Sequence, residues 1–113
     1  MSDHLALTLR KARNLLAGGW HATVSLDTAG CICHPRAEMV QRFSLHDAIE
    51  VCAPDVDTII EAEALLTVLA EPGHRRTLYD WEMEPTRAPR DVLALFDRGI
   101  TRAAMVARRG GTA

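Results

Sequence analysis

Apolar side chains recur at helical spacing in several stretches of the chain. The first such set is Leu5, Leu9, Ala12 and Leu16. Steps of three and four residues place these side chains on one face of a helix, so we expect an amphipathic helix over residues 4 to 17. Asp3 is positioned to cap its first turn, and Gly18-Gly19 is positioned to end it.

A second helix is predicted from the segment FSLHDAIEV. Ser44 can accept a hydrogen bond from the backbone N–H of Asp47, whose carboxylate then lies near the positive end of the helix. The helix is expected to end at Ala53-Pro54. Its apolar face consists of Leu45, Ala48, Ile49 and Cys52.

A third helix is expected to begin with Asp55 or Asp57 as its cap and to stop at Glu71-Pro72-Gly73. One face of this helix is apolar, and further apolar residues broaden it. The predicted buried positions are Ile59, Ala62, Leu66 and Leu69, with Ile60, Leu65 and Val68 beside them.

The C-terminal part predicts one more helix, from near Thr86 to about Arg108. Pro89 is tolerated in its first turn, where a missing N–H costs no intrahelical bond. The residues before it, 75 to 81, are predicted as a loop or a brief extended segment. The buried stripe is expected to be Val92, Leu93, Phe96, Ile100, Ala103, Ala104 and Ala107.

Between the first two helices, the segment TVSLDTAGCIC alternates weakly around a turn signature that ends in Gly30, which predicts a short β-hairpin. A helical turn is expected from Arg36 to Gln41. The fold class is therefore mostly α (α+β), with about four helices packed in one layer-pair and a short β-hairpin between the first and second helices. Residues 1–109 are expected to form a single globular domain, followed by a flexible tail at residues 110–113.

Length and composition limit the classes of protein to which the chain can belong. A chain of 113 residues with 48% hydrophobic and 25% charged residues is enough for one domain with one core. No apolar run approaches the ~18 residues that a membrane span needs, and the N-terminal charges lie inside the apolar pattern, unlike those of an export signal. Since three cysteines are an odd number, we expect reduced thiols and a cytoplasmic protein without a membrane segment.

Charge is distributed unevenly along the chain. Residues 45 to 72 hold seven acids and no Lys or Arg, whereas residues 73 to 113 hold eight arginines and five acids. This distribution predicts an acidic interaction surface formed by Glu50, Asp57, Glu61 and Glu63. Arg98, Arg102 and Arg109 lie near one face of the last helix, but no aromatic residues interleave with them. Nucleic-acid binding through this helix is therefore a less favoured alternative.

One cluster offers the side chains that zinc prefers, namely His21, Cys31, Cys33, His34 and His46. On a strand, Cys31 and Cys33 share a face and His34 points to the other, and no second pair with ligand spacing completes a tetrahedron. A small enzyme or metal site built from this cluster, with Asp80 and Glu82 as acid and base, is an alternative interpretation. No catalytic residue, metal or other cofactor is predicted.

The segment DWEME places acids at every second position around Trp81 and Met83. In an extended segment the carboxylates would lie on one side and the two apolar side chains on the other. We expect Trp81 and Met83 to plug into the core and the acids to face water. Trp20 and Trp81 are thus the predicted loop anchors.

Three segments carry a resemblance to a known family: Gly19-Trp20 after the first helix, FSLHDAIEV at the second, and YDWEMEPTRAPRDVLALFDRGI at the end. From about Leu5 to Ala104 the chain resembles DUF6197, a family of small actinomycete and phage proteins of unknown function. The resemblance implies a compact intracellular domain, linked to phages, with Trp20 and Trp81 as framework positions.

These observations together favour a small intracellular, non-catalytic interaction or regulatory module that presents an acidic surface. The expected partner is a protein, which includes a second copy of the chain in a homodimer. The enzyme or metal site and the nucleic-acid-binding helix are the two alternatives.

Overall fold

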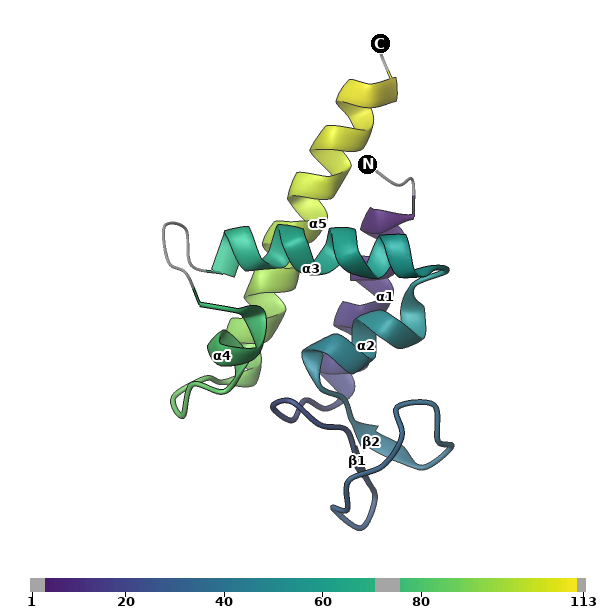
Figure 1. Cartoon of the computed structure of the whole chain (residues 1–113), viewed down its shortest axis with the longest axis vertical. Coiled ribbons are helices and arrows are strands. Elements are labelled where there is room, and N and C mark those ends of the chain that lie inside the picture. Colours follow the sequence, from purple (N-terminus) through teal and green to yellow (C-terminus); the bar gives the residue numbers. More distant parts are fainter. Residues whose placement is uncertain (1–3, 71–75, 112–113) are drawn as a thin grey trace.

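The computed structural model of the chain describes residues 4–70 and 76–111. Its elements, shown in Figure 1, are α1 (Leu5–Gly18), β1 (Leu26–Asp27), β2 (Val40–Arg42), α2 (Leu45–Cys52), α3 (Val56–Ala70), α4 (Leu78–Glu82) and α5 (Pro89–Gly111). The predicted fold class, mostly α with a short antiparallel hairpin between the first two helices, is confirmed. Within the described ranges, no helix is both long and apolar enough to cross a membrane.

The helices pack around one apolar core. α1 and α5 contact each other extensively, α3 crosses in front of both, and α2 lies below α3 against α1 (Figure 1). The hairpin is at the end of the molecule opposite the C-terminal part of α5. Helices α1, α2, α3 and α5 all contribute fully buried side chains, among them Leu9, Leu16, Ile49, Leu66 and Phe96.

Two predicted helix starts have the expected caps. The Ser44 hydroxyl accepts from the Asp47 N–H at 3.1 Å, and α2 begins at Leu45. Of the two candidates for α3, Asp55 is the cap, because its Oδ1 accepts from the Thr58 N–H at 2.8 Å. The predicted cap of α1, Asp3, lies outside the described residues.

The prediction for the buried face of α3 is partly wrong. Ala62 and Leu66 are buried as expected, but Ile60 and Val68 are 59% and 62% exposed. The helix carries apolar residues on all sides, so the sequence pattern alone does not select the side that faces the core. The predicted stop at Glu71-Pro72-Gly73 lies outside the described residues.

The hairpin differs from the prediction in its second strand. Gly30 adopts a φ of 80° in the predicted turn, and Leu26 forms a bridge with Ile32. The longer pairing, however, joins β1 to β2, where a helical turn was predicted for residues 36 to 41. The predicted turn is present, since Ala37 and Val40 donate their N–H groups to the His34 and Ala37 carbonyls, but residues 40 and 41 belong to β2. The chain is extended there because its continuation pairs with a distant segment, where the Phe43 N–H donates to the Gly19 carbonyl at 3.0 Å.

The segment predicted as a loop before the last helix contains α4. The Thr77 hydroxyl accepts from the Asp80 N–H at 3.1 Å and caps this short helix. Helical geometry turns Trp81 and Glu82 toward the protein interior, where they are 4% and 3% exposed. The expected alternation of acids and apolar residues is therefore wrong, and Met83 is 51% exposed instead of buried.

Helix α5 extends beyond its predicted bounds. Its backbone continues through Gly111, where a tail from residue 110 was predicted. Val92, Phe96 and Ala103 are buried as expected, and Leu95 is buried as well. Ala107 was predicted in the buried stripe but is exposed, because α5 extends past the helices that cover its lower part.

The end of α1 depends on a close approach between backbones. A Cβ at Gly19 would clash with the backbone oxygen of Gln41, whereas a Cβ at Gly18 would meet no atom within 4 Å. The glycine at position 19 therefore lets the strand segment lie directly against the end of α1.

We predict that Gly19→Ala lowers the free energy of unfolding by about 1 to 3 kcal/mol, because the backbone must shift to relieve the clash. Gly18→Ala is the matched control and should leave it unchanged or raise it by up to about 1 kcal/mol, since alanine favours the helix. Urea unfolding of both variants measures the difference. Equal stabilities would contradict the close approach.

Candidate functional site

A buried carboxylate joins three segments that are far apart in the sequence. Glu82 on α4 is 3% exposed, and its Oε2 accepts from the Trp20 indole N–H and from the Leu45 backbone N–H, both at 2.8 Å. Leu45 is the first residue of α2, so Glu82 satisfies a donor that the helix itself leaves free. The sequence had placed this side chain in water, and the structure corrects that expectation.

The environment of Glu82 changes its acidity. Burial raises the pKa of Glu82 above its ordinary 4.5 and outweighs the hydrogen bonds from Leu45, Trp20 and Thr23, which lower it. The charge of Asp47 raises the pKa further. A buried carboxyl with a raised pKa is typical of functional sites, although structural networks produce the same shift.

Thr23, which also lines the pocket beside Glu82, has a strained backbone. Its φ is 68°, in the left-handed region that β-branched residues rarely adopt. Such strain is retained only where surrounding contacts hold it in place.

A second titratable pair lies nearby. The Nδ1 of His46 on α2 is bonded to Oε1 of Glu63 on α3, and Nε2 lies 3.8 Å from Glu50 Oε2. Partial burial alone would lower the pKa of His46, but the hydrogen bond to Glu63 and the charges of three nearby carboxylates raise it above the ordinary 6.5. Carboxylates on two different helices thus stabilise the protonated form of His46.

These groups surround one pocket, with a volume of about 170 Å³. It lies where the start of α2 meets α3 and α4, and its lining residues are Thr23, Leu45, His46, Glu63, Leu78, Tyr79 and Glu82. The structure thus brings one imidazole and two carboxyls to one pocket.

Thr77 and Asp80 have the same spacing as Ser44 and Asp47, a hydroxyl followed three residues later by an acid. This spacing is the sequence signal of α4, and hence of the place of Glu82, that the prediction of a loop missed.

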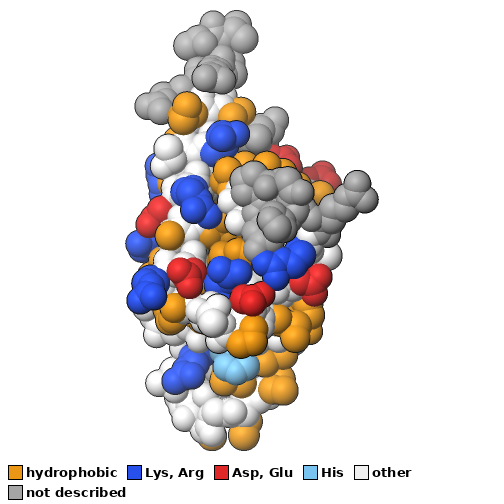
Figure 2. Space-filling model, turned by 90° about the vertical axis from the view of Figure 1, so that its left-hand side faces the viewer, with side chains coloured by type: hydrophobic (Ala, Val, Ile, Leu, Met, Phe, Trp, Pro, Cys, Tyr) orange, Lys and Arg blue, Asp and Glu red, His pale blue; other side chains and the backbone are white. Residues whose placement is uncertain are grey.

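On the side of the molecule where α4 lies, hydrophobic side chains gather below a band of charged ones (Figure 2). Two exposed apolar residues belong to this region of the chain, Tyr79 in α4 and Met83 just after it, at 57% and 51% exposure. The surroundings of the pocket therefore combine exposed apolar surface with acidic groups.

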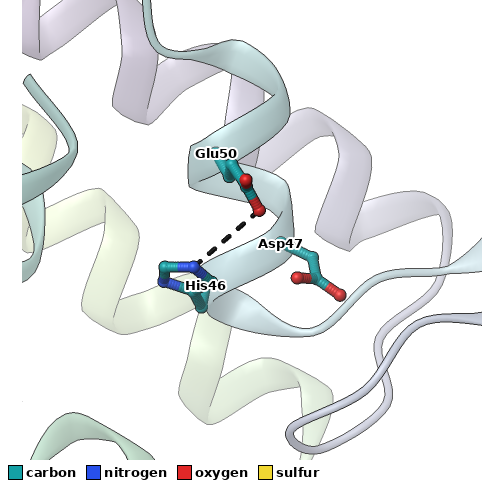
Figure 3. A group of neighbouring side chains, drawn as sticks. All are labelled: His46, Asp47 and Glu50. Carbon is teal, nitrogen blue, oxygen red and sulfur yellow. Dashed lines mark ion pairs between the residues drawn. The ribbon is translucent and has the colours of Figure 1, made fainter. Parts of the chain in front are cut away.

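One group in the described part of the chain offers three potential metal ligands. His46, Asp47 and Glu50 each have one ligand atom within 4.8 Å of the others. Figure 3 shows His46 and Glu50 directed toward each other on α2, while Asp47 leaves the helix on another side. Asp47 also accepts from the Ser25 hydroxyl at 2.7 Å, which occupies one of its oxygens. Imidazole and carboxylate suit zinc or manganese.

The Cys/His cluster considered as an alternative metal site is not among the three-ligand groups of the described residues. Of its five members only His46 belongs to the three-ligand group found among the described residues. Cys31 and His34 are exposed, Cys33 is half-buried, and His21 lies in the loop after α1. Burial, followed by the charges of Asp27 and Asp47, raises the pKa of the Cys33 thiol, and burial also raises that of Cys52. Fewer thiolates at neutral pH disfavour a cysteine nucleophile.

The four acids of the predicted interaction surface lie in two groups. Glu50 and Glu63 both face His46, whereas Asp57 and Glu61 lie on α3 away from it. Asp57 is exposed and Glu61 is half-buried. Three of the four acids therefore lie on α3, and Glu50 lies on α2.

The two predicted loop anchors are Trp20, which is bonded to Glu82, and Trp81, which precedes Glu82 in α4. Trp81 packs in the core beneath Arg87, whose guanidinium carbon is 3.8 Å from the ring centroid. Trp20 is half-buried and packs against the core while its indole donates to Glu82. The two rings therefore hold α4 and the loop after α1 in contact.

The basic positions of α5 are partly engaged within the protein. Arg98 donates to the Leu69 carbonyl near the end of α3 at 3.3 Å. Arg98 and Arg102 line a shallow hollow beside Asp97, which is itself paired with Arg13. The side chain of Arg109 lies outside the described residues.

We predict that Glu82 makes stability fall as pH rises above 4.5. The folded state holds the carboxyl proton more tightly than the unfolded chain, so the stabilisation is complete below pH 4.5 and is lost up to the raised pKa. Relative to Glu82→Gln, which does not titrate, the free energy of unfolding should fall by at most about 1.4 kcal/mol per pH unit in that window. Urea unfolding across this range measures it, and a relative gain in stability would contradict the prediction.

We also predict that Glu63 is the main cause of the raised His46 pKa. In Glu63→Gln the imidazole loses both a charge and the acceptor bonded to Nδ1, so its pKa should fall further than in Glu50→Gln, which removes only the more distant charge. NMR titration of the ring protons measures both. The linked stabilisation is present below pH 6.5 and is lost as pH rises through the folded pKa. An unchanged pKa in Glu63→Gln would contradict the pairing.

Comparison with known proteins identifies the family to which the chain belongs. A family model described as a family of unknown function (DUF6197) matches residues 1–102. Neither a curated protein nor a solved structure matches the chain. Because the match spans most of the sequence and agrees with the resemblance of its motifs, the chain belongs to the family DUF6197.

Proposed function

We propose that the protein is a small intracellular, non-catalytic interaction module that binds a basic amphipathic helix of a partner protein on the outer face of α3. One observation carries the proposal: apolar residues on the solvent side of this helix follow one another at intervals of four. This α3 stripe consists of Val56, Ile60, Ala64 and Val68, and its three larger members are 67%, 59% and 62% exposed.

The α3 stripe is contiguous. Each step of four residues advances about 40° around a helix, so the four side chains cover an arc of about 120°. The opposite side of α3, with Ala62 and Leu66, packs against the core. The outer side is the one that faces the viewer in Figure 1, where no other element crosses it. A contiguous apolar stripe on a water-exposed helix is typical of a protein interface.

Charge selects the kind of partner. α3 contains Asp57, Glu61 and Glu63 and no Lys or Arg. Glu63 lies one position before Ala64 and three after Ile60, on one side of the slanted stripe. Asp57 and Glu61 each follow a stripe residue by one position and lie on its other side. An apolar stripe with acidic edges complements a helix whose apolar face is bordered by Lys or Arg.

The same charges disfavour a two-fold homodimer through α3. Such an interface would bring together two helices that carry only acidic side chains, and like charges in proximity cost binding energy. A partner of opposite charge is therefore the better fit.

The intracellular part of the proposal is supported by the three free thiols, Cys31, Cys33 and Cys52, which suit a reducing compartment.

A defined peptide tests the proposal. We predict that an amphipathic model helix of Leu and Lys binds the full chain with an affinity that falls steeply with added salt, whereas the same helix with Glu in place of Lys does not bind. Ile60→Ser should weaken binding about tenfold, because it removes a central apolar contact. Isothermal titration calorimetry measures these affinities.

Ile32→Ser is the matched control. Ile32 is an equally apolar and even more exposed residue, at 73%, but it lies in the hairpin. Unchanged thermal unfolding of both variants shows that the fold is kept. Equal binding by Ile60→Ser and wild type, or equal binding of the Lys and Glu peptides, would overturn the proposal.

A further inference from the structure

We propose that the pocket lined by His46, Glu63 and Glu82 binds a small organic cation, an alkylammonium or guanidinium group on a short apolar stem. The inference goes beyond the α3 interface and does not depend on it. It rests on the size of the pocket, on the apolar character of its walls and on the sign of the charges that line it.

The size of the pocket limits the ligand. A cavity of about 150 Å³ accommodates benzene, so the present volume of about 170 Å³ admits a group of about six non-hydrogen atoms. Leu45, Leu78 and Tyr79 supply apolar walls. A butyl-sized stem therefore fits, and a nucleotide or sugar phosphate does not.

The charges of the pocket select a cation. Two carboxyls line it, Glu63 at the α3 side and Glu82 at the α4 side, and among the described residues neither Lys nor Arg lines the pocket. The one basic lining group, His46, is bonded to Glu63, and Asp47 and Glu50 surround it with further negative charge. An anion in this pocket would meet repulsion from two helices and from α4.

Both carboxyls retain capacity for a donor. A carboxylate has about four lone-pair sites, and His46 uses one of those on Glu63. On Glu82, Trp20 and Leu45 both donate to Oε2, and these two bonds occupy about two of its four sites. An ammonium group carries three donors and a guanidinium five, so either can bond both residues while its stem contacts the apolar walls.

Burial makes the interaction selective. A carboxylate taken out of water is costly unless a positive charge lies near it. Glu82 is 3% exposed, and the part of the chain that the structure describes places no Lys or Arg in the lining of the pocket. A cation from solution supplies that charge. A neutral alcohol of the same shape fills the apolar space but does not offset the buried charge, so it should bind more weakly.

The test is an NMR titration of the full chain with n-butylammonium chloride, above the pKa of His46. Butan-1-ol is the neutral control, sodium butyrate the anionic control, and sodium chloride at equal ionic strength the salt control. We expect saturable shifts at the amides of Thr23, Leu45, His46 and Tyr79 with butylammonium, and at least about tenfold weaker binding of the alcohol. Equal affinity for butylammonium and butan-1-ol would overturn the proposal, as would shifts that sodium chloride reproduces.

Two variants locate the charge that binds the cation. Glu63→Gln should weaken butylammonium binding about tenfold. Glu50→Gln is the matched control, because Glu50 also faces His46 but does not line the pocket. Both residues are partly exposed, at 33% and 45% of their side chains, so both variants are expected to fold. Equal losses in the two variants would contradict a site in the pocket and indicate general surface charge.

Further ligands identify the source of the cation. Nα-acetyl-lysine methylamide carries the butylammonium group on a peptide backbone, and its arginine counterpart carries the guanidinium. Binding equal to that of butylammonium identifies the ligand as a side chain of a protein, whereas binding of free butylammonium alone identifies a small amine. Ile60→Ser should leave butylammonium affinity unchanged, so failure of the α3 interface and failure of the cation pocket are separate outcomes.

Discussion

The structure depends most on the two hydrogen bonds that Glu82 accepts from Trp20 and Leu45. These bonds join residues 62 and 37 positions apart, and both end on one oxygen at 2.8 Å. They hold α4 against the loop after α1 and supply an acceptor to the first backbone N–H of α2. Because the carboxyl is buried, removing it would leave the Trp20 and Leu45 donors without this acceptor.

The candidate pocket is a consequence of the same contact. By fixing α4 beside the start of α2, Glu82 brings Leu78 and Tyr79 opposite His46 and Glu63. The group that closes the tertiary structure is thus also a wall of the pocket, and its raised pKa has a structural cause that is independent of any ligand. Stability measurements alone therefore do not reveal a role in binding, and ligand titration is the discriminating measurement.

Sequence reasoning succeeded where the determining contacts are local. The Ser44 and Asp55 caps each join residues three positions apart, so α2 and α3 could be located from the chain alone. It failed at β2 and at Glu82, because their partners lie elsewhere in the chain and a burial pattern does not identify them. α4 is intermediate. Its Thr77 cap is a local signal, but five residues are too few for a helical apolar period to show.

Glu63 links the two proposed surfaces physically. Glu63 lines the pocket and also lies beside Ile60 and Ala64 of the α3 stripe, so a single carboxylate contributes charge to both. A cation bound in the pocket neutralises that charge and weakens the attraction of α3 for a basic helix. By thermodynamic reciprocity, a helix whose Lys or Arg pairs with Glu63 weakens cation binding by the same factor. The two sites would be independent only if a bound helix made all its ionic contacts through Asp57 and Glu61, on the far edge of the stripe.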